Sequence, residues 1–342
     1  MRYVPIDAVE PGQFLGKTIF SGNGSILLSE NVQLTVYMIN TLKRIGVTML
    51  YIKDENFDDV DISDPVSEET KRVIIHKMCE TFETIRSGKM FSAADVSKSV
   101  ERLVEEVVQN KGVLVQLNDI RSHDNDQFLH AINVCMIATV IGMNMNLSMP
   151  QLKELAIGAL LHDIGKVGQE EDGDIRSQDH HTWRGFHLLK DKKEFSLLIA
   201  HIALQHHEML DASGFPRGLS EDKIHQYAKI VAVANTYDNF LYNPVTGQRM
   251  LPHEACERLS ALAGKQLDHE VVLHFLKTVS AYPNGTSVRL STNEIGVVVG
   301  QHRGLPMRPI VRIIKKHADG EVEAKEVDLA KETTVFIEAV LN

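Results

Sequence analysis

Through the middle of the chain, apolar residues recur every three or four positions, the spacing that buries one face of an α-helix. From about residue 112 to about 282, nearly every segment follows this pattern. One helix carries Leu129, Ile132, Cys135, Met136 and Thr139 on a single face, and the next begins at Ser148-Met149-Pro150. Further helices are predicted at about 180–190, 195–208, 225–242, 252–263 and 268–281. The pattern therefore predicts a mainly α protein.

Both ends of the chain depart from this pattern. Residues 1–60 read as a small α+β domain with strands at 16–20, 25–28 and 47–52 and one helix at 35–44. After residue 284 the apolar residues alternate or form short runs, which predicts strands. These strands are expected at 287–290, 295–300, 309–314 and 322–327. We thus predict a domain at 1–60, a helical connector at 61–119, a helical domain at 120–283 and a short β-rich segment at 284–342.

The connector contains two long amphipathic helices. Asp64-Pro65 is expected to open the first, with Asp64 as N-cap and Pro65 in the first turn, and the helix runs to about Arg86. Ser92 resembles the cap of a second helix that ends near residue 110. Two such helices fit a homodimer contact and packing within one chain equally well.

Composition narrows the classes of function. Of the 342 residues 43% are hydrophobic, but no run approaches about 18 consecutive apolar residues, so we expect no membrane insertion. The net charge of −10 argues against binding a nucleic-acid polymer. The first residues lack a basic region followed by an apolar run, so no secretory signal is expected. Three widely spaced cysteines are typical of reduced, buried thiols, which favours a cytoplasmic location.

Histidine is concentrated in one part of the chain. Nine of the 16 histidines lie between residues 123 and 207. Histidine is the commonest metal ligand and the usual proton carrier near neutral pH. His162-Asp163 follows an apolar helix, and His206-His207 ends another. Taken singly, these features also suit a solvated helix end, just as His130 suits a satisfied core position.

The order of these motifs resembles the HD-GYP family, a branch of the HD-domain metal-dependent phosphohydrolases. The resemblance covers about residues 120–281. It rests on a His before Ala-Ile-Asn-Val, on His-Asp-Ile-Gly-Lys at 162–166, on His-Thr-x-x-Gly at 181–185 and on His-His-Glu at 206–208. It implies an HD-domain helical bundle flanked by the two smaller segments.

The resemblance also implies roles for matching residues. The metal-ligand positions fall on His130, His162, Asp163, His181, His206 and His207, with Asp163 bridging two ions. Lys166 falls on a lysine that contacts the substrate phosphate and acts with Asp163 in catalysis, although a solvated cation at a helix end is the alternative. Asp126, one turn before His130, stands where some members have a Glu that supports a third metal, and an ordinary exposed acid is the alternative.

Two departures from the family pattern stand out. Asn235 occupies the place of the last ligand Asp, and an uncharged amide oxygen binds a divalent cation less strongly; Asp238 could substitute for it. In the name-giving loop, Gly-Tyr-Pro has become Gly214-Phe215-Pro216, and Ala212 replaces a Gly. The lost hydroxyl should weaken loop anchoring by about 1 kcal/mol.

The implied activity is hydrolysis of a cyclic dinucleotide, first of all cyclic di-GMP to linear pGpG and on to GMP, in bacterial signalling. Two divalent ions, Fe or Mn, suit a mixed His and carboxylate ligand set. Phe215, Pro216, Arg184 and Arg217 are candidate substrate contacts, and both arginines suit ordinary surface positions equally well. The alternatives are a weakly catalytic module that responds to cyclic dinucleotides, favoured by Asn235, and an HD hydrolase of another nucleotide.

Overall fold

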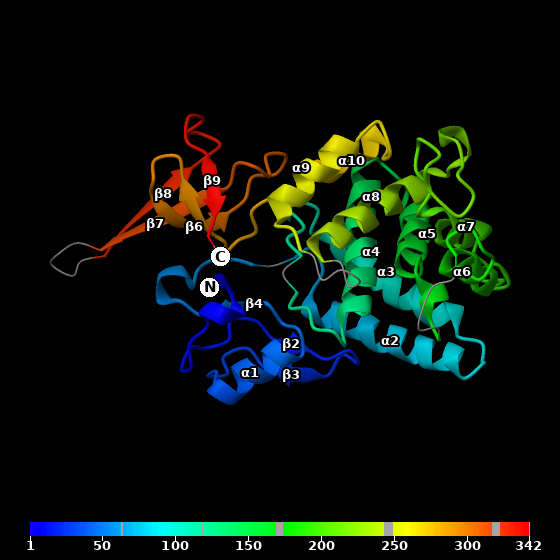
Figure 1. Ribbon diagram of the computed structural model, residues 1–342, viewed down its shortest axis with the longest axis horizontal. Helices are drawn as coiled ribbons and strands as arrows, with labels where there is room; N and C mark the ends of the chain where they lie inside the picture. Colours follow the sequence, from blue (N-terminus) through cyan, green and yellow to red (C-terminus); the bar gives the residue numbers. More distant parts are fainter. Residues whose placement is uncertain (63, 118, 169–173, 243–248, 317–321, 342) are drawn as a thin grey trace. The chain divides into compact units, whose positions relative to one another are not determined.

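The computed structural model describes residues 1–62, 64–117, 119–168, 174–242, 249–316 and 322–341 (Figure 1). The chain divides into two compact units. One unit contains both ends of the chain, and the other consists mainly of helices. Their segments are Met1–Asp64, Val113–Asp126 and Val279–Asn342 for the first, and Pro65–Gly112 and Gln127–Thr278 for the second. The finer four-part division at residues 60, 119 and 283 remains a prediction.

The N-terminal part of the first unit has the expected α+β character. Its elements are β1 (Arg2–Pro5), η1 (Ile6–Ala8), β2 (Ile19–Phe20), β3 (Ile26–Leu28), α1 (Val36–Arg44), β4 (Met49–Ile52) and η2 (Glu55–Phe57). β2 and β3, which fall within two of the predicted strands, pair antiparallel. β4 pairs antiparallel with β1, a strand that the sequence pattern did not indicate. Thr35 caps α1 by accepting from the backbone N–H of Met38, and the helix buries Ile39 and Leu42.

The C-terminal part of the first unit is a five-stranded antiparallel sheet, which confirms the predicted β-rich segment (Figure 1). The strand order is β8-β7-β6-β5-β9. Its strands are β5 (Ser287–Leu290), β6 (Ile295–Gly300), β7 (Ile310–Lys316), β8 (Val322–Asp328) and β9 (Ile337–Val340). Alternate residues such as Val288 and Leu290 are buried, and Val297 packs against Phe57 and Val60 from the N-terminal part of the same unit. β9 was not predicted.

The second unit is helical, as predicted. Its α-helices are α2 (Glu68–Arg86), α3 (Ala93–Gln109), α4 (Asp126–Asn144), α5 (Met149–Leu160), α6 (His181–Lys190), α7 (Leu197–Gln205), α8 (Gln226–Leu241), α9 (Pro252–Leu262) and α10 (His269–Leu276). Two short 3-10 turns, η3 (Ile164–Lys166) and η4 (Glu221–Lys223), lie between them. Ser92 and Ser148 cap α3 and α5 as expected.

The start of α2 differs from the prediction. Ser67, not Asp64, is the N-cap, and its hydroxyl accepts from the backbone N–H of Thr70 at 3.2 Å. The carboxylate of Asp64 instead accepts from the backbone N–H groups of Gln116 and Leu117. Both residue types are good caps, so local preference alone could not choose between them. α2 and α3 pack against each other within the chain, and dimerisation remains a prediction.

α4 is a long and apolar helix of the second unit. By length and composition alone its 19 residues could cross a membrane. However, 89% of its apolar window is buried inside the protein, and Ile132, Val134 and Cys135 are fully enclosed. Its apolar character is thus explained by its place in the helical core.

Candidate metal centre

Two helices distant in sequence position His130. Its ring lies on α4, and its Nδ1 atom is 2.6 Å from Oδ2 of Asp238 on α8. The other oxygen of Asp238 accepts from the amide of Asn133, one helical turn after His130. Asp238 is fully buried. The buried carboxylate therefore fixes the imidazole so that Nε2 faces away from α8.

The turn after α5 supplies His162 and Asp163. α5 ends at Leu160, and the Nδ1 atom of His162 lies 2.7 Å from the carbonyl oxygen of Ala159. The chain then turns through η3, where a Cβ on Gly165 would lie 2.0 Å from the carbonyl oxygen of His181. Only glycine allows this close approach. The His-Asp-Ile-Gly sequence therefore brings this turn against the start of α6.

The remaining histidines come from the facing ends of α6 and α7. His181 is the first residue of α6, and His206 is the C-cap of α7. Nδ1 of His206 is 2.9 Å from the carbonyl oxygen of Ala203, so His206 is oriented by the last turn of its own helix. His207 follows at once, and its ring lies 4.1 Å from that of His206.

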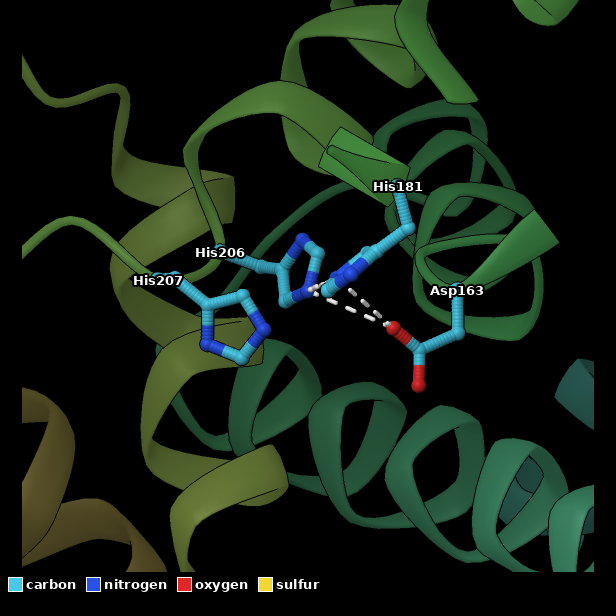
Figure 2. A group of neighbouring side chains, drawn as sticks. All are labelled: Asp163, His181, His206 and His207. Carbon is cyan, nitrogen blue, oxygen red and sulfur yellow. Dashed lines mark hydrogen bonds and ion pairs between the residues drawn. The ribbon is translucent and has the colours of Figure 1, made fainter. Parts of the chain in front are cut away.

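These side chains form two groups around one carboxylate, and Figure 2 shows the group of Asp163 with His181, His206 and His207. Oδ2 of Asp163 lies 3.7 Å from Nε2 of His130 and 3.4 Å from Nε2 of His162. Oδ1 lies 3.3 Å from Nε2 of His181 and 3.5 Å from Nε2 of His206. His207 belongs to the second group, whose candidate ligand atoms all lie within 4.8 Å of one another. Each oxygen of Asp163 thus faces its own set of imidazoles.

The proton positions show why the first group suits a cation. Nδ1 of His162 faces a carbonyl oxygen, which can only accept, so Nδ1 carries the proton and Nε2 presents a lone pair. The same argument holds for His130, whose Nδ1 faces the Asp238 carboxylate. The two Nε2 atoms are only 3.2 Å apart. Two lone pairs at this distance repel each other unless a cation lies beside them.

The second group has the same character. Nε2 of His206 presents its lone pair 3.4 Å from Nε2 of His181. Oδ1 of Asp163 is buried, and no hydrogen bond to it is present among the described residues. Metal-bound histidines commonly donate their other N–H to a carbonyl or a carboxylate, as His206 and His130 do here. The donor set therefore fits a metal ion in each group.

Burial sets the protonation of the site. It lowers the pKa of His206 to about 4 and that of His207 well below the usual histidine value. Burial acts to raise the pKa of Asp163, but the charge of Lys166 and the interaction with the neighbouring His162 hold that pKa well below its usual value. At neutral pH the two histidines are neutral and Asp163 is ionised, which is the state that binds a metal ion.

Lys166 lies at the open side of the turn. Its Nζ atom is 2.6 Å from Oδ2 of Asp163, and half of its side chain is exposed. A flexible lysine that is half in solvent can leave this ion pair when a more strongly charged anion, such as a phosphate, approaches. The position is compatible with the predicted contact to substrate.

The Gly214-Phe215-Pro216 loop covers His207. The Phe215 ring stacks on that of His207 at 4.5 Å, and its backbone N–H donates to the carbonyl oxygen of His207. A Cβ on Gly214 would lie 2.4 Å from the same oxygen, so glycine permits this contact. The Phe215–Pro216 peptide bond is cis. The Phe215 ring therefore lies over His207 even though the tyrosine hydroxyl is missing, and Pro216 is buried directly after it.

Sequence reasoning missed the residue that anchors this loop. The buried carboxylate of Glu208 accepts from the backbone N–H groups of Arg217 and Leu219, one with each oxygen. Its only signal in the sequence was its place directly after His206-His207. The loop also contains Ala212, which has φ of 60°, in the left-handed region that favours glycine.

The structure also locates the other candidate residues. Asn235 is buried on α8, and its side-chain oxygen accepts from the amide of Asn239 at 2.9 Å. Asp238 has both oxygens engaged on the Nδ1 side of His130, so it serves as an orienting partner. Asp126 forms an ion pair with Arg121 at 3.1 Å.

The two arginines predicted to contact substrate differ. Arg184 donates from Nε to the carbonyl oxygen of Gly165 at 2.8 Å and from Nη1 to that of Asp179. Its guanidinium is thus held against the turn that follows Asp163. Arg217 is exposed at the end of the Phe215 loop, where its backbone is tied to Glu208.

Comparison with known families identifies the helical unit. Residues 102–271 match the family model described as HD domain. The chain belongs to the HD-domain family. Residues 287–342, which include the C-terminal sheet of this HD-domain protein, match a second model, described as a KOW domain associated with HD domain.

Curated relatives support the HD-GYP resemblance, which is confirmed. The chain is 28% identical over 242 residues to a Pseudomonas aeruginosa protein named cyclic di-GMP phosphodiesterase PA4108, covering 68% of this chain and 58% of that one. It is 32% identical over 200 residues to a Thermotoga maritima protein named cyclic di-GMP phosphodiesterase, covering 54% and 52%. The chain therefore spans between half and three-fifths of the length of these relatives.

A solved structure supports the fold. The HD-domain chain is similar to Bd1817, an HDG"Y"P protein from Bdellovibrio bacteriovorus, with a TM-score of 0.51. The match covers 80% of this chain and 97% of Bd1817 at 17% sequence identity. Identity this low supports the shared architecture alone.

Proposed function

We propose that this protein is a metal-dependent phosphodiesterase that hydrolyses a cyclic dinucleotide, with cyclic di-GMP as the expected substrate. The observation that carries the proposal is the placement of Asp163, whose two oxygens face two separate groups of imidazoles. The names of the two curated relatives support the substrate class.

Two divalent ions would be held on opposite sides of Asp163. His130 and His162 would hold one, and His181, His206 and His207 the other, with the carboxylate bridging them. Iron or manganese suits this mixture of nitrogen and oxygen ligands better than magnesium does. A third ion at Asp126 would require that residue to leave its ion pair with Arg121.

The chain's own groups would then bind and orient the substrate. When bound, a metal pair lowers the pKa of a water molecule and stabilises charge on both sides of an in-line displacement. Lys166 would move from Asp163 to a phosphate oxygen and neutralise its charge. Hydrolysis adds the water oxygen to phosphorus and breaks one P–O3′ bond, and the 3′ oxygen leaves with a proton. The product is linear pGpG, and a second cleavage gives GMP.

Asn235 favours a second candidate function. The amide has no charge, and its oxygen already accepts a hydrogen bond from Asn239. A weaker metal site would leave a domain that binds cyclic dinucleotides and reports their presence with little turnover. An Asn235→Asp variant separates the two functions, because it restores a charge at this position without changing the side-chain size.

The decisive experiment combines metal content with turnover. Protein purified anaerobically under reducing conditions should contain at least one Fe or Mn per chain and open cyclic di-GMP when Mn²⁺ or Fe²⁺ is supplied. Both properties should disappear in the His162→Ala, Asp163→Ala double variant and persist in His76→Ala, which changes an exposed histidine of α2.

Three outcomes separate the alternatives. Fewer than one metal per chain together with no turnover rules out the enzyme. Cyclic di-GMP binding without turnover, followed by a gain of turnover in Asn235→Asp, supports the binding module. Hydrolysis of a different nucleotide under the same conditions assigns another substrate to the same centre.

A further inference from the structure

A cavity of about 520 Å³ lies in the second unit beside the turn that carries Asp163. The end of α2, η3 with the residues that follow it, and one side of α6 line it. Its basic side chains are Arg86, Arg184 and His187. No carboxylate is present among the described residues that line it. Its volume lies within the range of about 300–1,000 Å³ that is typical of small-molecule pockets.

Apolar side chains form the rest of the wall. Ile85, Val167 and Leu188 line the cavity next to the cationic groups. A bare phosphate ion would fill only a small part of this volume and would leave these walls in contact with water. The combination of cationic and apolar walls suits an organic phosphate with a flat, weakly polar body.

Two of these three basic side chains are held in place before any ligand binds. Arg184 is oriented by its hydrogen bond to the carbonyl oxygen of Gly165. The His187 ring stacks on Trp183, with 6.1 Å between ring centroids and 24° between their planes. Side chains that are already ordered lose little conformational entropy on binding, which favours affinity.

Arg86 is the most available of the three. It ends α2 and is exposed, and within the described part of the chain no carboxylate forms an ion pair with it. Its Cγ atom lies 3.9 Å from the point where a Cβ on Gly168 would be, and Gly168 has φ of 82°. The stem of Arg86 therefore lies beside the turn at Gly168, and both residues line the cavity.

The cavity is separate from the metal centre. None of its described lining residues belongs to either group around Asp163. It nevertheless shares a turn with that centre, because Gly165 lies two residues after Asp163. A ligand here would contact the chain beside the site and leave the imidazoles free to hold metal.

We propose that this cavity binds a nucleoside monophosphate, with the phosphate at Arg86 and Arg184 and the base against Ile85, Val167 and Leu188. The lining of the cavity supports this binding site independently of the proposed function. The choice of a guanine nucleotide as the probe rests on the proposed function, because GMP is a product of that reaction. A product bound here would sit next to the turn that carries Asp163 and Lys166.

The test measures GMP binding to metal-free protein in EDTA by calorimetry, so that no metal ion can hold the phosphate. The unaltered protein should bind GMP, and Arg86→Gln should weaken binding by about tenfold or more, the usual loss when a charged hydrogen-bond donor to phosphate is removed. Arg72→Gln is the matched control, since it changes an exposed arginine on α2 that does not line the cavity. Its affinity should match that of the unaltered protein.

Two further comparisons identify the site and the ligand class. GMP binding should persist in the His162→Ala, Asp163→Ala double variant, and guanosine and inorganic phosphate should each bind more weakly than GMP. If the protein lacks phosphodiesterase activity but still binds GMP in this way, only the proposed function fails. No GMP binding in EDTA, binding lost in the double variant but kept in Arg86→Gln, or phosphate binding as tight as that of GMP would overturn this proposal.

Discussion

The two groups of histidines around Asp163 are held by different means. His130 is oriented by a buried carboxylate that comes from another helix. His206 is oriented by a backbone carbonyl of its own helix, and its neighbour His207 is covered by the Phe215 ring. The first group therefore depends in part on one charged side chain from another helix, whereas the second depends on local backbone and on the loop above it. A substitution can therefore damage one group and leave the other intact.

Removing the shared carboxylate should have the largest effect, because both groups depend on it. We expect Asp163→Asn to lower the metal content below one ion per chain and to reduce phosphodiester turnover by roughly 1,000-fold or more, since a water molecule that is no longer activated is a far weaker nucleophile. Elemental analysis and a turnover assay measure these effects. Asp191→Asn, at the exposed end of α6, should change neither quantity. Retention of two ions per chain in Asp163→Asn would contradict the bridging role.

Asp238→Asn should damage only the His130 group. The amide can donate a hydrogen bond to Nδ1 of His130, which would favour the tautomer with its proton on Nε2, facing the metal position. Loss of such an orienting carboxylate typically reduces metal affinity by about 10–100-fold. A titration with Mn²⁺ should then show one weakened step and one unchanged step. Equal weakening of both steps would show that the two groups are not independent.

The contact between His130 and Asp238 also marks the limit of sequence reasoning. The two residues are 108 positions apart, and their hydrogen bond depends on how α4 and α8 pack. The resemblance to the HD-GYP family was sufficient to predict that His130, His162, Asp163 and His206 lie together. Spacing could not show that the carboxylate of Asp238 contacts Nδ1 of His130, on the side of the ring away from the metal position.

Short and isolated elements were missed for a similar reason. β1 has four residues, and its partner β4 begins 47 positions after the start of β1. A strand of four residues shows almost no periodicity. The sequence also does not indicate which distant segment such a strand pairs with. The start of α2 was misplaced because Asp64 and Ser67 are both good caps, and the contacts of Asp64 with Gln116 and Leu117 decide between them.

Acid should destabilise the metal-free protein through the second group. The pKa of His206 is lowered by burial to about 4, so between about pH 6.5 and pH 4 the unfolded chain binds a proton that the folded chain does not. Stability that is present above pH 6.5 is therefore lost as the pH falls towards 4, by roughly 3 kcal/mol. Urea unfolding in EDTA at several pH values measures this loss.

A variant of the same group tests the assignment. His206→Gln removes the titrating ring, so its stability should change less between pH 6.5 and pH 4 than that of the unaltered protein. Added Mn²⁺ should shift the loss to lower pH in the unaltered protein, because the ion competes with protons for the ring. An identical pH dependence in His206→Gln would show that other groups cause the acid sensitivity.

The smallest effect is expected in the loop that covers His207. Ala212 has φ of 60°, which costs a residue with a Cβ about 1–2 kcal/mol, whereas glycine adopts this conformation freely but loses more entropy on folding. Ala212→Gly should therefore raise the free energy of unfolding by up to about 1 kcal/mol, measured by urea unfolding, and should leave metal content unchanged. Gly218→Ala is the matched reverse change: Gly218 also has φ of 60°, and its Cβ would lie 3.1 Å from the carbonyl oxygen of Ala212, so this variant should be less stable. If Ala212→Gly destabilised the protein, the backbone at Ala212 would not be strained. The stacking of Phe215 and the hydrogen bonds of Glu208 would then be sufficient to hold the loop over His207.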